Sequence, residues 1–234
     1  MEVSCDLVDD TATGAPGATR RGERADDVRT RSEALRTLAR RGSARVIASC
    51  GLALLAVRAA LGGAGVLDAV IVVAALAVAG VGEWVVHRHL FHAPEQAWVA
   101  RRLGVGREHR RHHADPGALD TLLLRTPAAA VFVAVLGVVA AGVAVPLARV
   151  VGAPGARPAT TAWLVAVLAL GHYEWVHLLA HTRYRFRSRR YRRLARNHRV
   201  HHHRDDRSWF GVTSDVGDRL LGTRRAAAEA SRPG

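Results

Sequence analysis

Apolar residues are gathered into four long blocks, and polar or glycine-rich segments separate these blocks. The blocks cover residues 46–61, 66–86, 127–150 and about 160–177. A helix needs about 20 apolar residues to cross the hydrocarbon core of a bilayer, with about 17 as the lower limit. The pattern therefore predicts an all-α, multi-pass membrane protein with about four transmembrane helices.

Short breaker sequences mark where these helices end. Gly62-Gly63-Ala64-Gly65 predicts a tight turn between the first two blocks, and Ala93-Pro94 ends the segment after the second block. Asp115-Pro116-Gly117 predicts a turn in the polar stretch that follows, and residues 152–158 form a Gly/Pro-rich loop. The chain thus alternates between apolar helices and short connections.

The first block is the weakest of the four because it is short and contains Arg58. We expect this arginine either to extend to a membrane interface or to face protein. A re-entrant hairpin of the first two helices, or a buried hairpin in a soluble protein, is an alternative to two full crossings.

The two ends of the chain differ from the apolar blocks in composition. Residues 1–44 are polar and lack apolar periodicity, which predicts a disordered cytoplasmic tail that passes into a short basic helix over 31–41. No apolar stretch follows Met1, so we expect no signal peptide, and 44 such residues cannot form an electron-carrier domain. We expect a membrane domain over 45–225 and a tail over 226–234.

The basic charge indicates a membrane surface rather than a nucleic acid. The net charge is +14, and all 34 basic residues are arginine. These arginines flank the apolar blocks and accompany no recognition motif, so we expect anionic headgroups as partners and no nucleic acid. Two cysteines, Cys5 and Cys50, are too few for a disulfide framework.

The distribution of arginine predicts the orientation in the membrane. Nine arginines lie in residues 1–45, seven in 87–126 and fifteen after residue 181, whereas the loop near 149–157 has only two. The positive-inside rule then places both termini and the segment 87–126 in the cytoplasm of a cell-membrane protein. With four crossings, every histidine-containing segment emerges on that cytoplasmic face.

Histidine is the residue whose distribution demands a chemical explanation. All 13 histidines fall into four short motifs. Ten of them form two matching halves: His87-x4-His92 with His109-x2-His112-His113, and His177-x3-His181 with His198-x2-His201-His202. The step from the first motif of a half to its second is 17 residues in both halves. We infer a repeat that forms two similar half-sites facing one another.

This pattern of imidazoles is typical of a metal site. Neutral imidazole binds iron, zinc, copper and nickel. His177 and His181 are four residues apart and share a helix face, whereas His87 and His92 are five apart, which predicts an irregular or ending helix. Ten donors exceed the needs of one ion, so we expect two metals with about five nitrogens each.

Glu83 and Glu174 each precede a histidine by about one helical turn. Each could accept the second ring N–H of that histidine and fix its tautomer. Each could equally be an interfacial acid with other partners.

The order of the four histidine motifs, together with Trp209–Thr213 and Asp218–Thr223, resembles the fatty acid hydroxylase/sterol desaturase superfamily of membrane dimetal oxygenases. The likeness covers about residues 81–223. It implies four transmembrane helices and a cytoplasmic helical cap that holds both metals. The ligands that the resemblance implies are His87, His92, His109, His112, His113, His177, His181, His198, His201 and His202.

The other histidines lie outside this implied ligand pattern. His172, His203 and Asn197 are candidates for support of the site, and His89 is expected to face solvent. No catalytic residue beyond the ligands is implied.

The resemblance also implies a reaction: hydroxylation of an unactivated C–H bond of a lipid, most simply a fatty acyl chain. It implies two iron ions, replaceable by zinc, with O2 as co-substrate. The chain has no dinucleotide, haem or iron–sulfur motif, so an external redox carrier and reductase must supply electrons. The basic segment 183–199 suits either the docking of an acidic carrier or headgroup anchoring.

Two kinds of alternative stay open at this point. Within the superfamily, the protein could be a lipid or sterol desaturase or a carotenoid hydroxylase. From a different class, it could be a non-catalytic membrane protein that binds or transports metal. Product that requires O2 and reductant would distinguish catalysis from metal flux.

Overall fold

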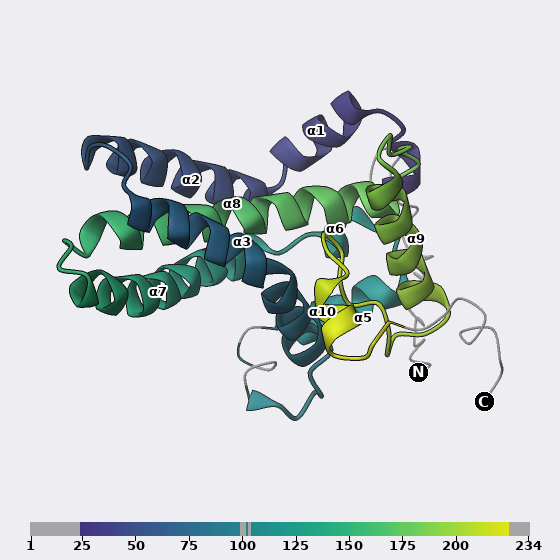
Figure 1. Cartoon of the computed structure of the whole chain (residues 1–234). Coiled ribbons are helices and arrows are strands. Elements are labelled where there is room, and N and C mark those ends of the chain that lie inside the picture. The colour runs from purple at the N-terminus through teal and green to yellow at the C-terminus, as the bar shows by residue number, and fades with distance from the viewer. Residues whose placement is uncertain (1–23, 99–101, 103, 225–234) are drawn as a thin grey trace, which may run out of the picture.

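The computed structural model describes residues 24–98, 102 and 104–224, and this part of the chain is all-helical, with an isolated bridge between Arg24 and Ala118 but no strand. Four long helices form the body of the molecule (Figure 1). They are α2 (Gly42–Ala60), α3 (Val66–Val86), α7 (Thr126–Val150) and α8 (Ala156–His181). The four predicted helices are therefore confirmed, within a few residues at their ends.

All four helices are long and apolar enough to cross a membrane. Their outer faces expose large apolar side chains, among them Leu52, Val73, Leu76, Val138 and Val143. Such exposure is costly in water, but it suits a surface that lipid tails cover.

Helix α8 is the centre of the bundle and packs against α2, α3 and α7. Small residues let the helices approach closely. At Gly137 of α7, an added Cβ would meet the ring of Trp163 at 2.7 Å, and the Trp163 indole donates a hydrogen bond to the carbonyl of Val133 at 2.9 Å. Close contact between small and large residues is the usual basis of helix association in lipid.

Arg58 faces protein, which is one of the two arrangements that its sequence position allows. Its guanidinium lies 3.2 Å from the carboxylate of Asp68, and its Nε donates to Thr161 at 2.8 Å. The Thr161 hydroxyl in turn donates to Asp68 at 2.6 Å. These groups join α2, α3 and α8 at the end of the bundle that lies away from the histidines.

The segment after α3 has the irregular geometry that the five-residue spacing predicts. Residues His87–Phe91 form a π-helical turn, η2, in which the amide of His92 donates to the carbonyl of His87 at 3.1 Å. Because the turn contains an extra residue, His87 and His92 lie on the same side of the chain.

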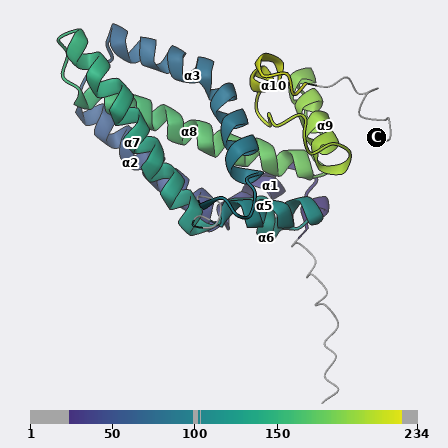
Figure 2. The same ribbon diagram turned by 90° about the horizontal axis from the view of Figure 1, so that it is seen from below.

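Short helices form a cap at one end of the bundle (Figure 2). They are η1 (Ala25–Asp27), α1 (Arg31–Ala39), α5 (Val105–Ala114), α6 (Leu119–Leu122), α9 (Arg189–His203) and α10 (Val216–Leu220). The predicted turn at Asp115 lies between α5 and α6, where the amide of Ala118 donates to the Asp115 carbonyl at 3.1 Å.

The segment from Arg24 to α1 belongs to this cap, and α1 matches the short basic helix expected there. Ala25, Val28 and Ala34 are buried in one core with Leu119 and Leu178, among others. The rest of the expected tail at 1–23 and the expected tail at 226–234 lie outside the described residues. The part of the 1–44 segment that the structure describes is thus folded onto the end of α8.

Candidate metal centre

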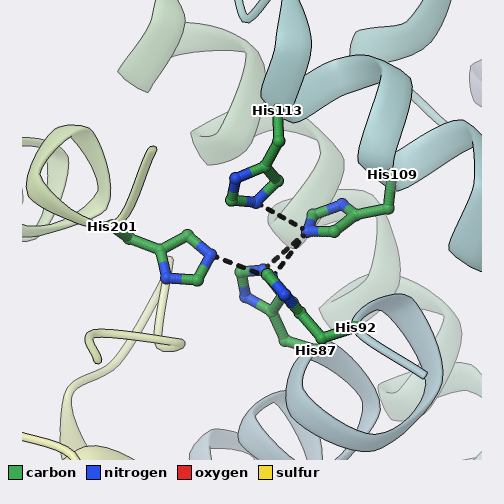
Figure 3. Close-up of side chains that lie close together, drawn as sticks. All are labelled: His87, His92, His109, His113 and His201. Atoms are coloured by element: carbon green, nitrogen blue, oxygen red, sulfur yellow. Dashed lines mark hydrogen bonds between the residues drawn. The ribbon is translucent and has the colours of Figure 1, made fainter. Parts of the chain in front are cut away.

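The structure brings the ten motif histidines together as two sets of five. In each set, the possible ligand nitrogens all lie within 4.8 Å of one another. Cluster A consists of His87, His92, His109, His113 and His201, and cluster B consists of His112, His177, His181, His198 and His202. Both clusters lie where the cap meets the bundle, and Figure 3 shows cluster A.

Each cluster takes four histidines from one half of the repeat and one from the other half. The exchanged residues are His112, which joins cluster B, and His201, which joins cluster A. Consecutive residues on a helix point about 100° apart, so neighbours on one helix can serve different sites. On α5, His109 and His113 therefore point to cluster A while His112 points to cluster B.

The spacing of the ring nitrogens fits a metal site. In cluster A, the Nε2 atom of His109 lies 3.1 Å from the Nε2 atoms of His87, His92 and His113. In cluster B, the Nε2 atom of His198 lies 2.9 Å from that of His181. Two nitrogens that bind one metal at right angles, each at about 2.0–2.1 Å, are about 3 Å apart.

Several of these nitrogens lack a partner in the folded chain. Both ring nitrogens of His112 and the Nε2 atom of His177 are buried and have no hydrogen-bond partner among the described residues. A buried polar atom without a partner costs roughly 1–3 kcal/mol. A metal ion would satisfy one ring nitrogen of His112 and the Nε2 atom of His177, so the residues present fit the group.

The protein environment favours neutral imidazoles in the cap. Burial, aided by neighbouring rings, lowers the pKa of His112 to about 2 and that of His113 to about 4. Burial also lowers the pKa of His109, His198 and His201. Neutral imidazole is the form that binds metals, so no proton competes near neutral pH.

Backbone carbonyls orient two histidines of cluster A. The Nδ1 atom of His87 lies 2.5 Å from the carbonyl oxygen of Phe210, and the Nδ1 atom of His201 lies 2.7 Å from that of Ser208. A carbonyl can only accept, so each Nδ1 carries the proton and donates it. Each Nε2 then presents its lone pair to the cluster.

The loop that supplies these carbonyls is itself held by Asp218. Its carboxylate accepts hydrogen bonds from the amides of Phe210 and Gly211, both at 2.9 Å, and from the hydroxyl of Thr223 at 2.7 Å. Trp209, in the middle of the loop, has a left-handed backbone with φ of 60°. A bulky residue adopts this conformation only when its surroundings enforce it.

Glu83 and Glu174 have partners other than histidine rings. Glu83 accepts hydrogen bonds from the amides of Val212 and Thr213 and from the Thr213 hydroxyl. Glu174 accepts from the Ser43 hydroxyl at 3.1 Å and from the Leu124 amide at 3.3 Å. Of the two arrangements left open for these acids, the described contacts show the one with backbone and hydroxyl donors, and the Nδ1 proton of His87 goes to the Phe210 carbonyl instead.

The remaining candidates belong to neither set of clustered nitrogens. His172 is exposed, with its Nε2 atom 3.0 Å from the Tyr191 hydroxyl, and His203 is exposed at the end of α9. Asn197 is buried on α9, and its side-chain nitrogen has no partner among the described residues. His89 is exposed, as expected.

A mostly apolar cavity of about 240 Å³ adjoins both clusters. Its lining includes His109 of cluster A and His177 of cluster B. Phe91, Leu122 and Tyr173 provide large apolar surfaces, and the ring of Tyr173 stacks on His177 with centroids 5.5 Å apart.

Sequence reasoning missed most of this lining and the orienting carbonyls. In the sequence, Phe91 and Leu122 cannot be distinguished from ordinary core residues. Any residue type can supply a backbone carbonyl such as that of Ser208. The signal that could have found the support is Asp218, the acid that begins the Asp218–Thr223 part of the family resemblance.

Fold and site together define a class: a helical membrane protein whose cap holds two clusters of buried histidines. The fatty acid hydroxylase family model matches residues 72–223, more than half of the chain. The chain therefore belongs to the fatty acid hydroxylase family, within the fatty acid hydroxylase/sterol desaturase superfamily. No curated protein and no solved structure gives a match.

Proposed function

We propose that this protein is a di-iron oxygenase that hydroxylates an unactivated C–H bond of a membrane lipid, most simply a fatty acyl chain. The observation that carries the proposal is the pair of five-histidine clusters beside one apolar cavity. Membership of the fatty acid hydroxylase family supports the same reaction class.

The overall reaction is R–H + O2 + 2 electrons + 2 H+ → R–OH + H2O. Clusters A and B would each hold one iron ion, and bound ferrous iron supplies the reductive activation of O2. The ten histidines are the proposed ligands. They bind through neutral nitrogens, and the carbonyls of Phe210 and Ser208 keep two of them in the required tautomer.

The protein's own residues would position the substrate. Phe91, Leu122 and Tyr173 present apolar surfaces that suit a hydrocarbon segment. The cavity also includes Pro127 and Ala128 at the start of α7, an apolar helix, so a lipid chain could enter from the membrane. A small cavity suits one end or one bend of a lipid rather than a whole molecule.

The orientation belongs to the same proposal. The arginine-rich segments 24–45, 87–125 and 183–224 all lie at the cap end of the bundle, apart from the undescribed residues within them. The positive-inside rule then favours a cell-membrane protein with its cap and both termini in the cytoplasm. A reductase and a redox carrier in the cytoplasm would supply the electrons.

Comparison of total lipids by mass spectrometry tests the proposal. Cells that express the unchanged protein with added iron should contain a lipid one oxygen heavier than its precursor. His201→Ala should abolish this product because cluster A loses a donor, whereas His203→Ala, an exposed neighbour, should retain it. A product two hydrogens lighter would instead identify a desaturase. Metal flux without any product would identify a binding or transport protein.

A further inference from the structure

Five arginines line an open groove at the end of the cap. The groove has a volume of about 750 Å³, and its lining contains no acidic residue. The lining residues are Arg29, Arg31, Arg183, Tyr184, Arg185 and Arg187. Within the described part of the chain, none of these five guanidinium groups takes part in an ion pair. Uncompensated positive charge of this kind indicates an anionic partner.

The groove is built on a fixed base. The amide of Arg183 donates to the carbonyl of Val28 at 3.0 Å, which joins the two segments that form its walls. Thr30 and Glu33 form a capping box at the start of α1. Tyr184 and Phe186 pack against the apolar core beneath. The arginines therefore project from a preformed surface.

The groove is separated from the substrate cavity. The core that contains Val28, Leu122 and Leu178 lies beneath the groove, and Leu122 also lines the cavity on the other side of this core. A substrate whose anionic end sat in the groove would have to pass through packed side chains. Electrons have no such requirement, because they tunnel through packed protein.

The groove is close to cluster B along the chain. Only Thr182 separates the groove residue Arg183 from the cluster B residue His181. A partner that docks over Arg183 thus lies beside a proposed ligand of a metal.

The groove also lies beyond the level at which α2 begins. Glu174 accepts a hydrogen bond from Ser43 in the first turn of α2, so it marks the level at which α2 begins. From there α8 continues for seven residues to His181, about 10 Å at a rise of 1.5 Å per residue.

We infer that this groove is the docking site of a soluble, acidic, one-electron carrier protein that reduces the metal centre. The inference rests on the proposed function, because O2-dependent turnover consumes two electrons that metal binding or transport alone would not need. Two reduced carriers each give up one electron, and those electrons are consumed with one O2, two protons and one C–H bond. Association should be fast at low salt and should weaken as ionic strength rises.

The test uses the full-length, iron-loaded protein in nanodiscs of zwitterionic lipid. The probe is an acidic [2Fe–2S] ferredoxin, with binding and turnover measured separately. The groove variant is Arg183→Gln/Arg185→Gln. The control is Arg107→Gln/Arg149→Gln, which removes the same charge from exposed positions on α5 and at the far end of α7. All three proteins should form product with dithionite and a small neutral mediator.

The groove variant should need at least about tenfold more ferredoxin for half-maximal binding and turnover, and the control should change less than about twofold. Equal ferredoxin binding by groove variant and control, or no binding by the unchanged protein at low salt, would overturn the inference. If the groove variant lost binding to phosphatidylglycerol vesicles but kept ferredoxin binding, the inference would be overturned, and the groove would instead be a site for lipid headgroups. Absence of dithionite-driven product in the unchanged protein would count against the hydroxylase function instead.

Discussion

At the scale of single residues, the candidate metal centre is a set of buried imidazoles that are preorganised to bind metal. Their nitrogens converge, burial keeps those of the cap neutral, and several lack any partner among the described residues. Folding such a site without metal leaves polar atoms unsatisfied, at roughly 1–3 kcal/mol each. Metal binding should therefore stabilise the folded protein as well as activate it.

Replacement of His112 tests the proposal that cluster B binds its own metal ion. His112→Ala should lower the iron content from about two to about one per chain, because cluster B loses its donor from α5. His172→Ala is the matched control, since His172 is exposed and lies apart from both clusters. Inductively coupled plasma mass spectrometry of the purified proteins gives the ratio. Two irons in His112→Ala would contradict the assignment.

Asp218 acts on the centre only through the loop that it holds. Asp218→Asn should weaken metal binding at cluster A by about 10–100-fold, because the carbonyls that orient His87 and His201 lose their support. Competition with a chelator measures this affinity. Asp215→Asn is the control: Asp215 pairs with Arg193 and Arg219 rather than with the loop amides. Equal affinities in the two variants would show that Asp218 has no positioning role.

At the scale of elements, the two halves of the histidine repeat interlock. Spacing alone predicted that His177 and His181 act together and that the helix after α3 is irregular. It did not predict the exchange of His112 and His201 between clusters, because that depends on where the fold places α5 and α9 relative to both clusters. It left the partners of Glu83 and Glu174 open, since carboxylates bind whichever donors the fold brings near.

The ion pair between Arg58 and Asp68, together with Thr161, joins α2, α3 and α8 at the end of the bundle far from the histidine clusters. Asp68→Ala should destabilise the protein by about 3–5 kcal/mol, because the Arg58 charge then stays buried without its partner. Reversible unfolding in mixed micelles measures the loss. Arg58→Met/Asp68→Leu should recover much of it, because no unpaired charge remains. A loss below about 1 kcal/mol for Asp68→Ala would show that solvent or lipid headgroups reach this pair.

At the scale of the whole molecule, the positions of the four long helices and of the polar segments follow from hydrophobic length and breaker residues. The cavity does not follow from them. Its lining combines residues from η2, α5, α6, α7 and α8, and Leu122 or Ala128 has no sequence feature that separates it from ordinary packing. Tertiary packing, rather than local preference, brings these residues to the histidine clusters. For the same reason, the arginine-lined groove could be recognised only from the structure.

Filling the cavity tests its role in substrate binding. Ala128→Phe should lower turnover at least about tenfold by occupying the space at the start of α7, while iron content stays at about two. Ala130→Phe places the same ring two residues further along, at an exposed position outside the cavity lining, and should leave turnover unchanged. Normal turnover in Ala128→Phe would show that the substrate binds elsewhere.

The central claim is that the protein transfers an oxygen atom from O2 to a lipid. Its most direct test is labelling with heavy oxygen: the iron-loaded protein is supplied with reductant and membrane lipid under ¹⁸O₂ in ordinary water. The account predicts a hydroxylated lipid that carries one ¹⁸O atom and that is absent from the His201→Ala reaction. A hydroxylated product without the label would mean that the oxygen comes from water, and it would contradict the oxygenase assignment.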